Sequence, residues 1–304
     1  MEKKLLVVGS INIDLVACAN HLPAPGETIL GSTFEVFNGG KGANQAVAIA
    51  KLGAPVEMIG SLGTDLFTER LLSGLEAAGV DTHAVQMVGG PCGVAHIARA
   101  DNGENSIIVV AGANRLVSAA YIDTHLAAVQ RSSMILVQLE TPLEAVVHLA
   151  EQAWQAKVGL MLDPAPARPL PEALLRRTTW LTPNETEAQI LLGRVNIDPA
   201  AAAEKLLAMG VQNVALKLGS QGVFLAGRDC AAQQVPAFKV EAVDTTAAGD
   251  CFNAAFAVAL TRGNPPVVAA RYASAAAAIS VTRAGAQPSL PTSAEVEAFL
   301  AHSN

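Results

Sequence analysis

Short and almost continuous apolar runs alternate with alanine- and leucine-rich stretches along most of this chain. Runs without polar alternation are typical of parallel strands that are buried on both faces of a sheet. Glycines such as Gly53, Gly79 and Gly210 follow several of the intervening stretches, and glycine is the usual residue just past the last turn of a helix. The alternation therefore predicts an α/β fold with helices on both faces of a mainly parallel sheet. The expected strands are 4–9, 56–60, 134–139, 158–163, 179–182 and 214–218, and the expected helices are 43–52, 67–78, 143–155, 200–209 and 251–262.

Two regions interrupt this alternation. Residues 28–37 and 93–110 have the pattern of strands joined by turns, with no helix between them. We interpret them as a small separate sheet, inserted over about 12–38 and 92–111 of one domain that spans residues 1–304. The alternative is a pair of ordinary surface hairpins.

Composition and charge narrow the class of partner. Half of the 304 residues are hydrophobic (51%) and 15% are charged, which is enough for a large core. No run approaches the ~20 apolar residues of a membrane span, and the first apolar run turns polar too early for a signal peptide. The net charge of −7, without a basic block, argues against nucleic acid. Any anion must therefore be bound locally, by backbone N–H groups, helix ends or a metal. Four scattered cysteines without a C-x-x-C pair suggest a reducing cytoplasm; they are Cys18, Cys92, Cys230 and Cys251.

Asp244 and Asp250 flank a run of small residues directly before an apolar helix. The backbone N–H groups of residues 247–250 would point out of the start of that helix and form an anion hole. A carboxylate at the same point can accept a proton from a hydroxyl group. A base beside an anion hole is what phosphoryl transfer to an alcohol requires. The alternative is that Asp250 is an ordinary helix N-cap.

A glycine-rich loop, N-G-G-K-G-A-N-Q-A, occupies residues 38–46 and can bring Asn44 to the mouth of the following helix. It matches neither a Walker A loop nor a dinucleotide-binding fingerprint. Upstream, Asn12 and Asp14 are two residues apart on an extended segment, so their side chains share a face and can clamp neighbouring hydroxyls. The alternative for this pair is turn chemistry at a strand end.

Two further stretches are open to a structural and a functional interpretation. Asn184 and Glu187 open a helix three residues apart, which suits a capping box or, for Glu187, a hydrated magnesium ion. Residues 216–222, L-K-L-G-S-Q-G, end a strand in a turn between glycines. That turn can lie beside an adenine or a phosphate, or simply join two strands of a hairpin.

The motifs taken together, in this order, resemble the ribokinase (PfkB) family of carbohydrate kinases over essentially the whole chain. They are G-G-K-G-A-N-Q-A-V-A, Q-L-E (138–140), D-P-A-P-A (163–167), T-P-N-E-T-E (182–187) and D-T-T-A-A-G-D-C-F-N. The resemblance implies a three-layer αβα core with a mainly parallel sheet and a small β-sheet lid. It also implies a cytoplasmic, homodimeric enzyme, paired through the lid. Such an enzyme would transfer the γ-phosphoryl group of ATP to the primary 5-hydroxyl of D-ribose or a similar pentose, with Mg²⁺ and K⁺ as cofactors.

The resemblance also implies roles for individual positions. Asp250 would be the catalytic base, and Ala247, Ala248 and Gly249 the anion hole. The sugar would contact Asn12, Asp14, Gly40, Lys41, Gly42, Ala43, Asn44, Glu140 and Asp250. The nucleotide would contact Asn184, Lys217, Gly219, Ser220, Gly222, Gly249 and Ser274, with Glu187 holding magnesium through water. Potassium would be bound by Asp244, Thr246, Ser280, Arg283, Gly285 and Ser289, and would partner the Asp244 carboxylate.

Three positions depart from the commonest family pattern. Lys217 replaces a frequent threonine and can reach the phosphates or point to solvent, Ser274 replaces a larger polar residue, and Cys251 follows the base. One rival interpretation is a kinase of the same fold for deoxyribose, another sugar or a nucleoside. The other is a catalytically silent sugar sensor, against which the intact Gly249-Asp250 pair argues.

Overall fold

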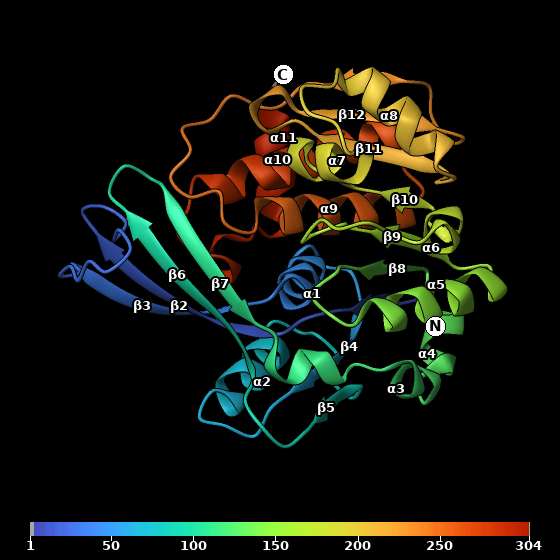
Figure 1. Ribbon diagram of the computed structural model, residues 1–304. Helices are drawn as coiled ribbons and strands as arrows, with labels where there is room; N and C mark the ends of the chain where they lie inside the picture. Colours follow the sequence, from blue (N-terminus) through green and yellow to red (C-terminus); the bar gives the residue numbers. More distant parts are fainter. Residues whose placement is uncertain (1–2, 304) are drawn as a thin grey trace.

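The computed structural model of the protein describes residues 3–303 and contains a large and a small β-sheet (Figure 1). Among these residues the large sheet has the strand order β13-β12-β11-β10-β9-β8-β1-β4-β5. Neighbouring strands from β11 to β5 pair in parallel, whereas β12 and β13 add an antiparallel edge. The strands are β1 Leu5–Val8, β4 Val56–Leu62, β5 Val85–Met87, β8 Met134–Val137, β9 Gly159–Leu162, β10 Trp180–Leu181, β11 Asn213–Lys217, β12 Val223–Gly227 and β13 Gln233–Val235.

Helices cover both faces of this sheet. Leu5 and Val7 pack into a core with α1, α2, α9 and α10, while Leu6 and Val8 pack into a second core with α3 to α8. Successive side chains of a strand point to opposite faces, so one continuous apolar run supplies both cores. The three-layer prediction is thus confirmed. The helices are α1 Lys41–Lys51, α2 Thr68–Ala77, α3 Ala119–Asp123, α4 Leu126–Arg131, α5 Leu143–Gln155, α6 Glu172–Arg177, α7 Glu185–Leu192, α8 Pro199–Ala208, α9 Ala248–Thr261, α10 Pro266–Val281 and α11 Ser293–His302.

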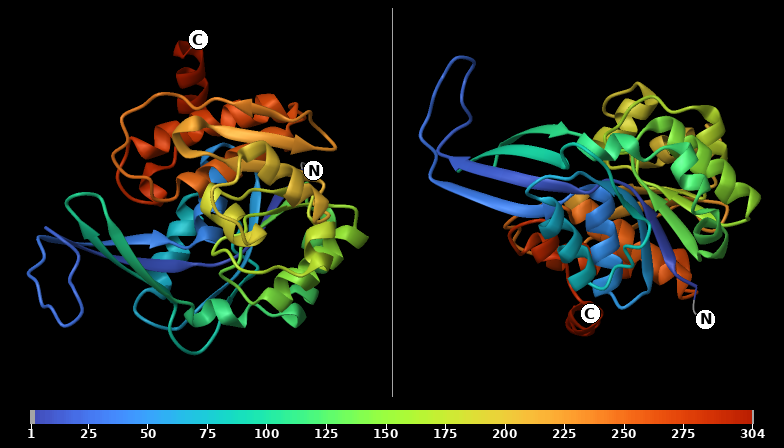
Figure 2. Two further views of the ribbon diagram at one scale, coloured as in Figure 1. Left: turned by 45° about the horizontal axis from the view of Figure 1, so that its top comes forward. Right: turned by 90° about the horizontal axis from the view of Figure 1, so that it is seen from below.

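The small sheet stands to one side of the core in the order β3-β2-β6-β7 (Figure 1). Its strands are β2 Asn12–Ala19, β3 Thr33–Gly39, β6 Gly93–Ala100 and β7 Asn105–Val110. Parallel pairing of β2 with β6 joins the two insertions into one sheet. The separate sheet is therefore confirmed and the surface-hairpin interpretation is wrong. The loop between β2 and β3 extends beyond the sheet (Figure 2), and the strand expected from residue 28 begins only at Thr33.

Most predicted boundaries lie within two residues of the observed ones, but the helix predicted over 251–262 begins three residues earlier. Its N-cap is Ala247, which adopts a left-handed conformation with φ 59°. Ala248 is therefore the first helical residue, and Asp250 lies inside the first turn. Within residues 3–303 no helix has both the length and the apolar character needed to cross a membrane.

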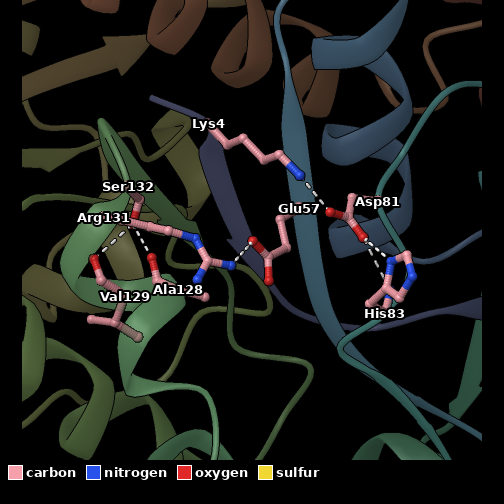
Figure 3. A network of polar contacts seen from close by, with 8 residues as sticks. All are labelled: Lys4, Glu57, Asp81, His83, Ala128, Val129, Arg131 and Ser132. Carbon is pink, nitrogen blue, oxygen red and sulfur yellow. Dashed lines mark hydrogen bonds and ion pairs between the residues drawn. The ribbon is translucent and has the colours of Figure 1, made fainter. Parts of the chain in front are cut away.

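Ion pairs connect elements at the amino ends of β1 and β4 (Figure 3). Arg131 at the end of α4 donates to Glu57 of β4 over 2.7 Å, and Lys4 contacts Asp81, whose carboxylate also contacts His83. The Glu57 side chain is buried, so Arg131 supplies the partner that a buried carboxylate needs. These contacts tie α4 and the segment after α2 to the sheet, at the edge opposite the polar side chains described next.

Candidate active site

Polar side chains meet at the carboxyl edge of the large sheet. β1 lies between β4 and β8, and the chain leaves β1 at this edge, where ligands bind in open α/β sheets. A cavity of about 780 Å³ opens there. Its lining includes every residue predicted to contact the nucleotide, namely Asn184, Lys217, Gly219, Ser220, Gly222, Gly249 and Ser274. The predicted base Asp250, the predicted anion-hole residues Ala247 and Ala248, the predicted sugar residue Lys41, Glu187 and Asp163 also line it.

Asp250 is buried (5% exposed) in the first turn of α9, yet it borders the cavity. Asn44 Nδ2 donates to Asp250 Oδ2 over 3.0 Å, and Gln45 Nε2 donates to Oδ1 over 3.1 Å. Both donors belong to α1. The interpretation of Asp250 as an N-cap is wrong, because Ala247 is the N-cap and the carboxylate is held by side chains of another helix.

Burial raises the pKa of Asp250 to about 6. Lys41 and the two amide donors act in the opposite direction, while the nearby Asp163 carboxylate adds to the rise. Burial alone would lower the pKa of Lys41, but the field of Asp250, Asp163 and Glu140 outweighs it and raises that pKa above its ordinary value. Lys41 therefore stays a cation, and Asp250 can be ionised near neutral pH and still accept a proton.

The first turn of α9 offers only part of the predicted anion hole. Helix geometry leaves the Gly249 and Asp250 N–H groups without intrahelical acceptors, but the Ala248 N–H donates to Thr245 O over 3.2 Å. The Lys217 side chain points toward the start of α9, because a Cβ built on Gly249 would lie 3.4 Å from the Lys217 Nζ atom. The solvent-facing alternative for Lys217 is therefore wrong.

A second polar cluster lies where β2 leaves the core. Asn12 Nδ2 donates to Glu140 Oε2 over 3.4 Å, Ser10 Oγ donates to the same oxygen, and Asn114 Nδ2 donates to Asn12 Oδ1 over 2.7 Å. Asn12 and Asp14 lie within β2 on one face, so the turn interpretation is wrong. Burial raises the pKa of Asp14 to about 7, with further contributions from Glu140 and Asp250 and an opposing one from Lys41.

The glycine-rich loop seats α1 against this cluster. Gly40 has φ +89°, and a Cβ on Gly42 would lie 2.6 Å from the Gly9 carbonyl carbon. Ala43 N donates to the backbone oxygen of Ser10, two residues past the end of β1, over 2.9 Å. These close backbone approaches bring Lys41 and Asn44 to the carboxyl edge of the sheet.

Two stretches were open to a structural and a nucleotide-binding interpretation, residues 184–187 and residues 216–222. The structure is compatible with both interpretations of each. Asn184 and Glu187 form a capping box at the start of α7, as expected of that sequence, and Glu187 still lines the cavity. The turn at Gly219–Gln221 joins antiparallel β11 and β12, so it is a hairpin, and it also lines the cavity. Residues 3–303 contain no group of three His, Cys, Asp or Glu arranged to hold a metal. Magnesium, which keeps several waters and takes few carboxylates, is compatible with Glu187 alone.

The predicted potassium ligands lie near the end of α10. The Asp244 carboxylate accepts the Thr246 and Gly285 N–H groups and lies 3.7 Å from Arg99 of β6, so its charge has protein partners. The pairing of Asp244 with potassium stays a prediction. Ser280 and Ser289 hydrogen-bond each other over 2.9 Å, and Arg283 pairs with Glu295.

Several site residues escaped the sequence-based prediction. Gln45 and Asn114 hold the amide network, and Gln138 Nε2 donates to Gln45 Oε1 over 2.7 Å. Asp163 accepts from Gln45 and from Lys217. Gln138 and Asp163 each directly follow a buried strand, so their position at the carboxyl edge was a usable signal.

Comparison with known proteins identifies the class that this fold and site define. Residues 2–293 match the profile of the pfkB family of carbohydrate kinases. The chain belongs to this family and is a kinase that phosphorylates a hydroxyl group. It is 42% identical to a ribokinase of Bacillus subtilis over 98% of this chain and 99% of that one. It is 37% identical to a deoxyribokinase of Salmonella typhi, over 97% and 98%. The structure of Arabidopsis thaliana ribokinase complexed with ribose and ATP covers 99% of both chains, with a TM-score of 0.92 and 36% identity.

Proposed function

We propose that the protein is a ribokinase, which transfers the γ-phosphoryl group of ATP to the 5-hydroxyl of D-ribose. The observation that carries this proposal is the setting of Asp250, a buried carboxylate held by Asn44 and Gln45 at the start of α9 and open to the cavity. The full-length similarity to ribokinases supports the choice of sugar.

In this mechanism Asp250 accepts the proton of the attacking hydroxyl as the phosphoryl group is transferred. Asn44 and Gln45 fix the two carboxylate oxygens, and the Lys41 cation opposes the rise in the Asp250 pKa that burial causes. Phosphoryl transfer passes through a loose transition state, so positioning and charge neutralisation contribute more than strong basicity. The Gly249 and Asp250 N–H groups face the transferred group. Glu187 would hold magnesium through water, and the ion would neutralise phosphate charge.

The sugar hydroxyls would bind to Asn12, Asp14 and Glu140, which supply both donors and acceptors at the base of the small sheet. A site built to hydrogen-bond a hydroxyl strongly rejects an analogue that lacks it. We expect kcat/KM for D-ribose to exceed that for 2-deoxy-D-ribose by at least about 10-fold.

A panel of pentoses, hexoses and nucleosides with ATP, with products identified by phosphorus NMR, tests the assignment. A preference for deoxyribose or a nucleoside would replace ribose by that acceptor. Absence of ADP release with every acceptor would instead indicate a sugar sensor.

Potassium activation is the second part of the proposal. Helix α10 ends at Val281 beside the Asp244 backbone, whose N–H donates to Val281 O over 3.1 Å. The C-terminus of a helix carries partial negative charge, which attracts a cation. Rates should fall when potassium is replaced by sodium at constant ionic strength. Equal rates in the two salts would remove the cation site from the proposal.

Location and assembly complete the proposal. All four cysteines are free in the structure, as suits a reducing cytoplasm.

The small sheet carries exposed apolar side chains such as Phe34 and Ile108 (64% each), and a second copy of this sheet would cover them. We expect a cytoplasmic homodimer paired through this sheet.

A further inference from the structure

The Asp163 carboxylate is buried between Lys217 and the side chains of α1 that hold Asp250, and it has no part in the mechanism given above. It directly follows β9, and its two oxygens accept from different elements. Lys217 Nζ, at the end of β11, donates to Oδ1 over 3.2 Å, and Gln45 Nε2, on α1, donates to Oδ2 over 3.2 Å. One carboxylate thus holds a cation on one side and an amide on the other.

The Gln45 amide transmits this contact to the base. Its nitrogen donates to both Asp163 and Asp250, and its oxygen accepts from Gln138. An amide nitrogen has two hydrogens, so each carboxylate receives one of them, and the Gln138 bond fixes which way the amide faces. Any movement of Asp163 therefore moves the group that orients Asp250.

The Lys217 ammonium faces the place where the transferred group would lie. Within residues 3–303 its one hydrogen-bond acceptor is Asp163, although an ammonium has three donors. Its nitrogen lies 3.4 Å from the Cβ position of Gly249, beside the first N–H groups of α9. The side chain is 13% exposed, so the remaining N–H groups point into a confined space.

A polyanionic nucleotide needs cations in this cavity. The charged side chains that line it are four carboxylates, Asp163, Glu185, Glu187 and Asp250, and three lysines, Lys41, Lys217 and Lys239. Lys41 stands in the field of Asp250 and Glu140 on the sugar side. Lys217 is the lysine that Asp163 holds beside the anion hole.

We propose that Asp163 is a positioning residue that aligns donor and acceptor: it holds the Lys217 ammonium against the transferred phosphoryl group and, through Gln45, holds the base Asp250. Lys217 is then a catalytic residue that neutralises charge on the phosphoryl group during transfer. This inference rests on the proposed kinase reaction; it adds Asp163 to that reaction and gives Lys217, a predicted nucleotide contact, a role in the transfer itself.

Steady-state kinetics of single and double variants test the link. Asp163→Asn should lower kcat by about 10- to 100-fold, the worth of a charge-assisted hydrogen bond, with the KM for ribose nearly unchanged. Lys217→Met should lower kcat by a similar factor because Lys217 acts during transfer, while Lys217→Arg, which keeps the charge, should retain more activity than Lys217→Met.

Because both residues act at one point, the double variant D163N/K217M should be little worse than the poorer single variant. Asn12→Ala is the matched control, since Asn12 contacts Glu140 and Asn114 rather than Asp163, and its effect should multiply with that of Asp163→Asn. Thermal unfolding verifies that each variant is folded, and ribose binding measured by calorimetry does so for the Asp163 and Lys217 variants.

Near-normal kcat in Asp163→Asn, or effects of Asp163→Asn and Lys217→Met that multiply, would overturn the inference. Asp250→Asn separates this failure from failure of the proposed function. If Asp250→Asn is inactive while the Asp163 and Lys217 variants are normal, only the positioning role fails. If Asp250→Asn is also normal, the kinase mechanism fails with it.

Discussion

At the scale of single residues, the proposed sugar-binding residue Asp14 lowers the stability of the ligand-free protein at neutral pH. It is 8% exposed beside the Glu140 and Asp250 carboxylates, and burial with this repulsion raises its pKa from 3.8 to about 7. The folded protein then binds the Asp14 proton more tightly than the unfolded chain does. Stability contributed by this group therefore falls as the pH rises from about 4 to about 7.

Asp14→Asn should stabilise the ligand-free protein above neutral pH. Three pKa units correspond to about 4 kcal/mol, so we expect a gain on the order of 1–4 kcal/mol at about pH 8, together with weaker ribose binding. The gain should shrink toward zero as the pH falls below about 4, where the carboxyl becomes protonated in both states. Thermal unfolding of both proteins across this range measures it. A variant whose advantage is the same at both ends of the range would contradict the charge argument.

Residue patterns predicted the position of the base and of the Asn12–Asp14 pair, but not the partners that hold them. Gln45 and Asp163 are 118 residues apart, and Asn44 and Asp250 are 206 apart. Such contacts depend on how α1, β9 and α9 pack together, and no local spacing encodes them. The catalytic and binding roles of these residues stay predictions until variants are measured.

At the scale of elements, the contact between α1 and β1 positions both donors to the base. The start of α9 was predicted too late because Ala247, Ala248 and Gly249 carry no capping side chain, and the left-handed turn at Ala247 is not encoded by residue type. The edge strand β13 was missed for a related reason, since a short edge strand has little periodicity, and β12 was foreseen only as the second strand of a hairpin after residues 216–222. The long apolar runs, in contrast, were located within two residues.

Gly42→Ala should disrupt the close packing of the start of α1 against Gly9 and Ser10. The added methyl group would lie 2.6–2.7 Å from backbone atoms of Gly9 and Ser10, which cannot move as a side chain can. We expect a loss of about 1–3 kcal/mol in the free energy of unfolding and a fall in kcat, because Asn44 and Gln45 shift with the helix. Gly89→Ala is the matched control, since its methyl group meets nothing within 4 Å. Urea unfolding and turnover measured on both variants test this prediction. Equal stability and equal kcat in Gly42→Ala and Gly89→Ala would show that the close packing at Gly42 is not needed.

At the scale of the whole molecule, the small sheet has one face toward the core and one away from it. Asp14 and Arg99 share the inner face, and Arg99 pairs with Asp244 of the core. Phe34 and Ile108 lie on the opposite face, as the pairing of alternate residues across β2, β3, β6 and β7 requires. The separate sheet was predictable from the missing helices, whereas its parallel pairing of β2 with β6 was not.

Ile108→Lys should weaken self-association. A charge placed on the exposed edge strand β7 would be buried without a partner in a dimer formed through this face. Sedimentation velocity should show a dimer for the unmodified protein and a shift toward monomer for the variant. Trp154→Lys on α5, also exposed but far along the chain from the small sheet, serves as the control. A monomeric unmodified protein would contradict the assembly proposal.

The most direct test of the account is the turnover of Asp250→Asn with ATP and D-ribose, measured beside ribose binding to the same sample. Loss of a general base predicts a kcat lower by about 10²–10⁴-fold, and binding nearly unchanged because the amide keeps the shape of the carboxylate. A variant that binds ribose and turns over at close to the normal rate would contradict the assignment of Asp250 as the base.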